Sequence, residues 1–247
     1  MKNSPPNYDK NHPKSICRLF SSIATNYDRA NSVLSWQMHR RWNSYLVDSV
    51  VEASRPQVML DLCCGTGDIA FNYLSRVQGS KNAPAKVYML DFCQEMLDCA
   101  KAKSTSLQLA AFDLEYMRAD AHVIPLPDQS VDCVTMAYGI RNVRDPLQCA
   151  KEVRRVLRPG GSFGILELTR PVNPLLRLGH QLYLKTLLPV LGRLVTSNQD
   201  AYQYLCQSIH TFIPPAELEG ILQAGGFCQT WRKSLTGGIA TVLCGRK

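Results

Sequence analysis

The stretch MLDLCCGTGDIAF, from Met59 to Phe71, decides the fold that we expect for this chain. An apolar run typical of a buried strand leads into a glycine turn, and a segment that suits a helix follows the turn. Gly65, Gly67 and Ala70 satisfy the pattern G-x-G-x-x-A. In a strand–turn–helix unit, this pattern places backbone N–H groups against a nucleotide-like ligand. The stretch therefore predicts a nucleotide-binding α/β unit.

Two acidic residues beside the turn help to choose between the cofactor classes that use such loops. A dinucleotide pyrophosphate would lie at the helix start, where Asp61 and Asp68 flank it. Repulsion there would cost on the order of several kcal/mol in a partly desolvated site. S-adenosylmethionine carries an ammonium, a sulfonium and no phosphate, so we expect Asp61, Gly65 and Gly67 to help form a site for this cofactor. The alternative is that Asp68 only caps the helix.

The order of apolar segments predicts the architecture. Short apolar runs at 58–62, 87–91, 131–137 and 162–168 alternate with helix-like segments at about 67–77, 94–103 and 146–157. Such alternation is typical of a parallel sheet with helices on both faces. The segments 227–235 and 238–246, with TGG as the turn, predict a terminal strand pair. We expect an α/β fold: a doubly wound, mostly parallel seven-stranded sheet with one antiparallel strand at its end.

The segments outside this alternation of strands and helices indicate how the chain is organised. Residues 1–14 are polar and proline-rich, and we expect a flexible tail; residues 15–247 should form a single domain. Apolar residues recur at spacings of three and four in the region 15–55, which predicts an N-terminal helical cap. The leucine-rich region 170–213 predicts a helical lid insertion before the last strands.

The net charge does not select a class of partner, whereas the cysteine spacing argues against a metal site and against a disulfide framework. The net charge of +8 and the pI near 9.0 fit nucleic acid, an anionic membrane surface, an anionic ligand or an ordinary solvated surface, without choosing among them. The ten cysteines include no C-x-x-C pair, so we expect no metal site and no disulfide framework. Reduced cysteines, the lack of a secretory signal and the lack of a long apolar stretch predict a cytoplasmic protein, with any membrane contact peripheral and at the inner face.

Two further positions suit a nucleoside. Asp91 ends the second strand, where a carboxylate fits a ribose diol. Asp120 and Ala121 precede the fourth strand, in a loop that should lie over the crevice where the strand order reverses. Asp120 would there accept the exocyclic amine of an adenine. The alternative for Asp120 is an exposed loop carboxylate with no ligand.

Two longer stretches carry a more specific resemblance. YDRANSVLSWQMHRRW, from Tyr27 to Trp42, resembles the motif Y-D-x-x-N-x-x-L-S-x-x-x-H-x-x-W of the UbiE/MenG methyltransferases of menaquinone and ubiquinone biosynthesis. RVLRPGGSFGILELT, from Arg155 to Thr169, is similar to their R-V-L-K-P-G-G motif, and GTGD and YGIRNV also agree. The resemblance spans roughly Phe20 to the C-terminus. It implies the class I methyltransferase fold and methyl transfer from S-adenosylmethionine to a ring carbon of a polyprenylated quinol.

The resemblance also implies site residues. Cofactor contacts carry over at Thr66, Asp91, Asp120 and Ala121, whereas Ala137 stands where some members have a serine that binds the cofactor. That side-chain hydrogen bond is therefore absent from this chain.

Methylation of carbon needs an electron-rich ring, so the site must remove or shield a hydroxyl proton. Arg141 and Asn142 follow the fourth strand, and we expect Arg141 to stabilise a quinolate or orient a water, and Asn142 to bind a ring oxygen. The alternative for Arg141 is an ion pair with Glu167. His39 is a candidate base from the N-terminal helices, with a structural histidine as the alternative.

The segment 174–195 combines leucines with basic residues. It suits a cover for a prenyl tail that also touches anionic headgroups; a core helix or a subunit interface is the alternative. We expect demethylmenaquinol as the substrate and menaquinol as the product, with 2-methoxy-6-polyprenyl-benzoquinol as the alternative acceptor. A methyltransferase for another acceptor such as RNA, a non-catalytic S-adenosylmethionine-binding protein and a nicotinamide oxidoreductase are the rival functions. We expect no nucleic-acid partner, and the oligomeric state stays open.

Overall fold

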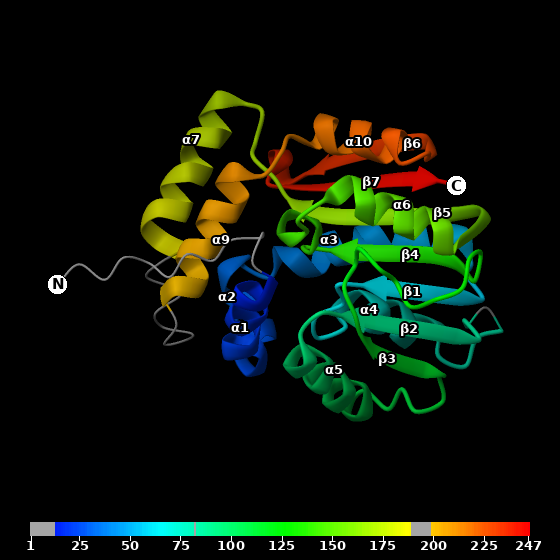
Figure 1. Cartoon of the computed structure of the whole chain (residues 1–247). Helices are drawn as coiled ribbons and strands as arrows, with labels where there is room; N and C mark the ends of the chain where they lie inside the picture. The colour runs from blue at the N-terminus through cyan, green and yellow to red at the C-terminus, as the bar shows by residue number, and fades with distance from the viewer. Residues whose placement is uncertain (1–12, 82, 189–198) are drawn as a thin grey trace.

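The computed structural model describes residues 13–81, 83–188 and 199–247 (Figure 1). Within these residues, seven strands form one sheet in the order β3-β2-β1-β4-β5-β7-β6. The strands are β1 (Val58–Leu62), β2 (Lys86–Asp91), β3 (Leu114–Arg118), β4 (Val131–Ala137), β5 (Leu157–Leu168), β6 (Cys228–Leu235) and β7 (Ala240–Arg246). β1 to β5 pair in parallel, which confirms the predicted doubly wound sheet.

The position of the antiparallel strand differs from the prediction. β7 does not end the sheet: it lies between β5 and β6 and runs antiparallel to both. The short 3₁₀ turn η5 (Thr236–Gly238) folds β7 back along β6, with Gly237 and Gly238 at φ values of 67° and 97°. Because β7 takes the free edge of β5, β6 becomes the edge strand.

The RPGG segment, residues 158–161, has the composition of a turn between a helix and the next strand, but the structure does not place it in a separate turn. It lies within β5, which starts at Leu157. The register of β4 against β5 shifts between Val131 and Cys133, beside this segment. Gly160 has a φ of 80° and donates its N–H to the carbonyl oxygen of Lys247 at 3.0 Å. The glycines therefore form an irregularity inside the strand rather than a connection before it.

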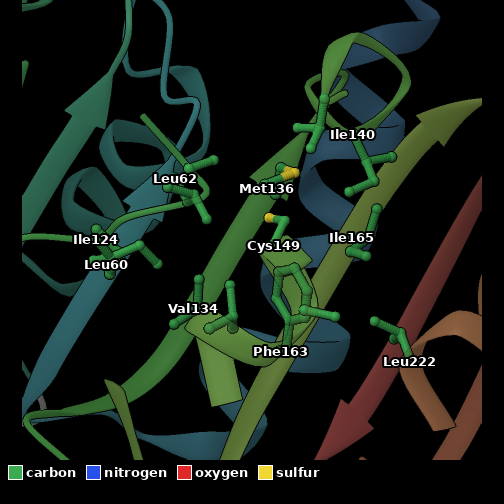
Figure 2. Close-up of a cluster of buried hydrophobic side chains, with 14 of the residues drawn as sticks. Leu60, Leu62, Ile124, Val134, Met136, Ile140, Cys149, Phe163, Ile165 and Leu222 are labelled. Atoms are coloured by element: carbon green, nitrogen blue, oxygen red, sulfur yellow. The ribbon is translucent and has the colours of Figure 1, made fainter. Parts of the chain in front are cut away.

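Helices cover both faces of the sheet. One face carries α3 (Met38–Leu46), the π-helical η2 (Val47–Glu52), α4 (Asp68–Val77) and α5 (Gln94–Ser106), and the other carries α6 (Pro146–Val156) and α10 (Pro215–Ala224). Neighbouring residues of β1 serve opposite faces: Met59 packs under α4, whereas Leu60 lies in the cluster that Cys149 of α6 and Leu222 of α10 complete (Figure 2). This double burial explains the continuous apolar run in the sequence.

A second group of helices gathers at one end of the sheet, beyond the carboxyl ends of the parallel strands (Figure 1). They are α1 (Pro13–Ile23), α2 (Tyr27–Leu34), α7 (Pro174–Leu182), the π-helical η4 (Tyr183–Leu187) and α9 (Gln199–Thr211). They confirm the predicted N-terminal helices and the helical insertion before the last strands. The expected tail falls outside the described residues except for its last two, which begin α1. Among the described residues, none of the helices combines the length and the apolar composition of a membrane span.

Candidate functional site

The two glycines of the loop between β1 and α4 have different functions. Gly67 has a φ of 84°, and a Cβ placed on it would lie 2.4 Å from the ring of Phe71. Only glycine therefore fits at this turn into α4. A Cβ on Gly65 would meet nothing within 4 Å, so Gly65 leaves the loop open on the side where a ligand can approach.

Asp91 at the end of β2 holds this loop in place. Its carboxylate accepts the backbone N–H of Gly65 at 2.8 Å and that of Cys93 at 2.9 Å. Burial raises the pKa of Asp91, although these two hydrogen bonds act in the opposite direction. The carboxylate joins β2, the glycine loop and the start of α5 at one point.

Two adjoining cavities open around the glycine loop and Asp91, and we call the two together the donor cavity. The larger part holds about 860 Å³ of space including its mouth, and Gly65, Asp91, Asp120, Ala121 and Asn142 line it. The smaller part is lined by Asp61, Thr66 and Asp68, and it shares Gly65 with the larger part. Apart from Gly67, which packs against Phe71, every residue predicted to bind the cofactor lies on these walls.

Asp120 is held by a residue that the sequence reasoning missed. Its carboxylate accepts the backbone N–H of His122 at 2.9 Å and also contacts Nδ1 of that ring. Nε2 of His122 accepts the N–H of Asp145 at 3.1 Å, so Nδ1 is the nitrogen that donates to Asp120. Burial alone would raise the pKa of Asp120, but the hydrogen bonds from His122 outweigh it and lower the pKa.

The acidic residues of the loop belong to a network with α2 and α5. The Thr66 hydroxyl donates to Asp28 at 2.5 Å. Lys103 of α5 contacts both Asp28 and Asp68. Gly67, not Asp68, is the N-cap of α4, so Asp68 acts through this ion pair rather than as the cap that the alternative hypothesis proposed. The network ties the N-terminal helices to the loop.

Asp61 is buried where β1 meets α4. Its carboxylate accepts the hydroxyl of Thr135 at 2.8 Å and the N–H of Ala70 at 3.3 Å. Burial nevertheless raises its pKa to about 7, because two hydrogen bonds replace only part of the lost hydration.

A second cavity, here called the acceptor cavity, lies between the N-terminal helices and the insertion helices. It holds about 1000 Å³ including its mouth, and both Arg141 and His39 line it. Tyr27 and Tyr138 line the donor and the acceptor cavities alike. The two cavities therefore meet at this pair of tyrosines. Both tyrosines lie in motifs that carry the family resemblance, Tyr27 in YDRANSVLSWQMHRRW and Tyr138 in YGIRNV, but the sequence analysis assigned neither of them to the site.

Arg141 faces the acceptor cavity and forms the ion pair that the alternative hypothesis proposed. Nη1 donates to Glu167 and to the carbonyl oxygen of Tyr138. Burial alone would lower the pKa of Arg141, but the Glu167 carboxylate raises it. Within the described chain, Nε of Arg141 is buried and has no hydrogen-bond partner, and such an orphaned donor favours a ligand that can pair with it.

Asn142 lies on a wall of the donor cavity, whereas His39 lies on a wall of the acceptor cavity. Asn142 lines the donor cavity, and its amide oxygen accepts the Tyr204 hydroxyl at 2.7 Å. On the acceptor side, Nδ1 of His39 lies 2.7 Å from Oγ of Ser35, which donates its own proton to the carbonyl oxygen of Asn31 at 2.6 Å. Oγ must then accept from Nδ1, which leaves Nε2 of the neutral ring as the basic nitrogen. Burial lowers the pKa of His39 and favours that neutral form.

Comparison with known proteins places this architecture in a family. The ubiE/COQ5 methyltransferase family matches residues 8–247. This chain belongs to that family. A demethylmenaquinone methyltransferase of Protochlamydia amoebophila is 53% identical over 240 residues, covering 97% of this chain and 98% of the relative. The ubiquinone/menaquinone biosynthesis C-methyltransferase UbiE of Saccharophagus degradans is 34% identical, covering 96% and 93% of the two chains.

The fold agrees with this assignment. The solved structure of an S-adenosylmethionine-dependent methyltransferase from Thermotoga maritima, described as a possible histamine N-methyltransferase, matches with a TM-score of 0.60 at 18% identity, covering 93% of this chain and 99% of that one. As a member of the ubiE/COQ5 methyltransferase family, this chain is an S-adenosylmethionine-dependent methyltransferase. Its donor cavity fits the cofactor, because the carboxylates of Asp91 and Asp120 on the walls of the larger part are acceptors that suit hydroxyl and amine groups.

The raised pKa of Asp61 predicts a pH-dependent stability. Between about pH 4 and pH 7, the folded protein keeps a proton on Asp61 that the unfolded chain has lost, so this group makes the free energy of unfolding fall as pH rises through that window. The fall is on the order of 4 kcal/mol. Urea unfolding from pH 4.5 to 7.5 should show a shallower decline for Asp61→Asn than for the parent.

Asp132→Asn is the matched control, because hydrogen bonds from Val58 and Arg158 outweigh burial and lower the pKa of Asp132. Its contribution changes only below about pH 4, so this variant should keep the parent slope. Identical slopes for Asp61→Asn and the parent would contradict a protonated Asp61.

Proposed function

We propose that this methyltransferase converts demethylmenaquinol to menaquinol by transferring a methyl group to a ring carbon. The observation that carries the proposal is the meeting of the donor and acceptor cavities at Tyr27 and Tyr138, in a chain that is 53% identical to a demethylmenaquinone methyltransferase over nearly its whole length. This geometry allows a methyl donor and a large apolar acceptor to approach from opposite sides of one boundary.

On the donor side, we assign Asp91 to the ribose hydroxyls and Asp120 with Ala121 to the adenine. Thr66, Gly65 and Asp61 border the space for the amino-acid portion, and Gly67 shapes the loop. When bound, S-adenosylmethionine supplies an electrophilic methyl group on a sulfonium. Asn142 lines this cavity, so we assign it to positioning the donor rather than to the ring oxygen as the sequence suggested.

On the acceptor side, we assign separate functions to His39 and Arg141. Nε2 of His39 is the basic nitrogen, so we assign it the proton of the quinol hydroxyl. Arg141 stabilises the resulting quinolate through its fixed positive charge. The negative charge raises electron density at the ring carbon that forms the new C–C bond, as the bond between the methyl group and the sulfonium sulfur breaks. That carbon then loses its hydrogen as a proton to solvent, which restores the aromatic ring as a quinolate, and the protonated His39 returns its proton to the oxygen. Leu184, Leu188 and Leu205 line the same cavity and offer an apolar path for the tail.

We further propose a peripheral contact with an anionic membrane surface at the cytoplasmic face, and the exposed leucines of α7 in the helical insertion support it. No residue of α7 is buried, and the side chains of Leu175, Leu178 and Leu182 are 77%, 64% and 61% exposed. His180 on the other side of α7 lines the acceptor cavity, as does Tyr183, the first residue of η4. One segment therefore presents apolar side chains outward and a cavity wall inward, as a lid between the bilayer and the site requires.

A benzoquinol is the second candidate acceptor. The relative from Saccharophagus degradans is named for both ubiquinone and menaquinone biosynthesis. 2-Methoxy-6-polyprenyl-benzoquinol presents the same hydroxyl chemistry to His39 and Arg141, on one ring instead of two.

The acceptor is tested by an assay with both quinols. The purified protein, labelled S-adenosylmethionine and short-tailed demethylmenaquinol in detergent should give menaquinol with the label on the ring carbon, as measured by mass spectrometry. We expect a higher kcat/KM for the naphthoquinol than for the benzoquinol. Methylation of the benzoquinol alone, or of neither quinol, would contradict the proposal.

The Arg141 assignment is tested by a pair of variants. Arg141→Ala should lower kcat by roughly 10²–10³, the range for losing one preorganised stabiliser of charge, with S-adenosylmethionine affinity nearly unchanged. The single variant leaves Glu167 buried without its partner, which is destabilising. The double variant Arg141→Ala/Glu167→Gln removes this effect, and its kcat should remain low. Parent-like turnover in the double variant would make Arg141 a purely structural residue.

The membrane contact is tested on vesicles that contain anionic lipid. The triple variant Leu175→Ser/Leu178→Ser/Leu182→Ser should bind at least roughly tenfold more weakly in a sedimentation assay, because burying one leucine contributes about 1.5–3 kcal/mol. Added salt should weaken parent binding, since Arg177 and Lys185 contribute about 1 kcal/mol each near the surface. Arg193, a further basic residue of the segment 174–195, lies outside the described residues.

The double variant Leu107→Ser/Val123→Ser is the matched control, because these side chains are also exposed but belong to other segments, directly after α5 and between β3 and β4. It should bind vesicles as the parent does. Equal binding by the triple variant and the parent would exclude α7 as the docking surface.

A further inference from the structure

Two cysteines and a glutamate, whose side chains have no function in the proposed methyl transfer, converge beside the donor cavity, and both cysteines line it. Cys17 lies on α1, Cys93 is the N-cap of α5, and Glu95 lies in the first turn of α5. One ligand atom from each lies within 4.8 Å of the other two. The cysteines are far apart in sequence, so the spacing rule that argued against a metal could not detect a pair that only the packing of α1 on α5 creates.

A hydroxyl completes the cluster. Oγ of Ser21 donates to Oε2 of Glu95 at 2.8 Å and lies 3.2 Å from Sγ of Cys93. Sγ of Cys93 donates to the same carboxylate oxygen at 3.1 Å, and Sγ of Cys17 lies 4.0 Å from the Ser21 hydroxyl. Two sulfur and two oxygen atoms thus face one another between two helices.

This donor set selects a class of metal ion. Thiolates favour zinc and similar borderline or soft ions, whereas Mg²⁺ and Ca²⁺ prefer oxygen ligands alone. Zinc binds thiolate at about 2.3 Å and carboxylate at about 2.0–2.2 Å in a tetrahedron, so its ligand atoms lie within roughly 4 Å of one another. The ligand atoms of the cluster, within 4.8 Å of one another, lie close to that spacing. We propose that Cys17, Cys93 and Glu95 bind Zn²⁺, with Ser21 or a water in the fourth position.

The position of the site gives the ion a function. Ile16, Cys17 and Phe20 of α1 form one wall of the donor cavity, and α1 packs on α5 through a small apolar cluster centred on Met96. An ion bound by both helices would cross-link them and fix that wall. Binding releases the two thiol protons to solvent. Zinc therefore slows the exchange of S-adenosylmethionine by holding α1 closed over the cavity.

Cobalt is the spectroscopic probe, because thiolate ligands give Co²⁺ a charge-transfer band in the near ultraviolet. The full-length protein, kept reduced, should bind one equivalent of Co²⁺ with this band, and Zn²⁺ should displace it. Cys17→Ser and Cys93→Ser should each weaken binding by at least roughly tenfold, since losing even an outer partner of a ligand costs about 10–100-fold. Cys99→Ser, a partly buried cysteine further along α5, is the matched control and should bind as the parent does.

Glu95→Gln provides a second test that keeps both thiols and should also weaken Co²⁺ binding, whether or not the cysteine variants fold. Stopped-flow measurements should show slower S-adenosylmethionine release from the zinc-loaded parent, and no effect of zinc in Cys17→Ser. The absence of a thiolate band in the parent, or a band that persists in both cysteine variants, would overturn the zinc site. A zinc-independent release rate in a parent that binds zinc would overturn the clamp.

Discussion

The hydrogen bonds from the backbone of Gly65 and Cys93 to the Asp91 carboxylate are the interaction on which the site depends. A strand end and two separate turns share one acceptor, so the left-handed glycine loop is fixed where it opens to the donor cavity. The same carboxylate lines that cavity. A residue that must hold the loop and face the ligand tolerates little change, because shortening it or removing its charge disturbs both functions at once.

From this point, a chain of polar contacts positions the N-terminal helices. Thr66 bonds Asp28 of α2, and Lys103 of α5 bonds Asp28 and Asp68. Tyr27 precedes Asp28 in the chain, so the contacts that hold α2 against the loop also place this tyrosine at the boundary between the cavities. The donor loop and the acceptor cavity are thus not independent parts: the network that shapes one locates a wall of the other.

The sequence predicted what depends on local pattern. The strands at β1, β2 and β4 and the loop residues at Gly65, Asp91 and Asp120 follow from periodicity and turn chemistry. It could not predict what depends on tertiary packing. The place of β7 between β5 and β6 is set by which edge remains free, and the pairing of Arg141 with Glu167 was only one of two alternatives. No spacing rule in the sequence predicts the contacts of His122 with Asp120, or those of Cys17 with Cys93 and Glu95.

We propose that one donor cavity, anchored at Asp91, directs a methyl group across the boundary formed by Tyr27 and Tyr138. A crystal structure with S-adenosylhomocysteine tests it most directly. We expect ribose hydroxyls on the Asp91 carboxylate, the homocysteine portion beside Asp61 and Thr66, and the sulfur facing the two tyrosines. A ligand whose ribose does not touch Asp91, or whose sulfur points away from the acceptor cavity, would contradict it.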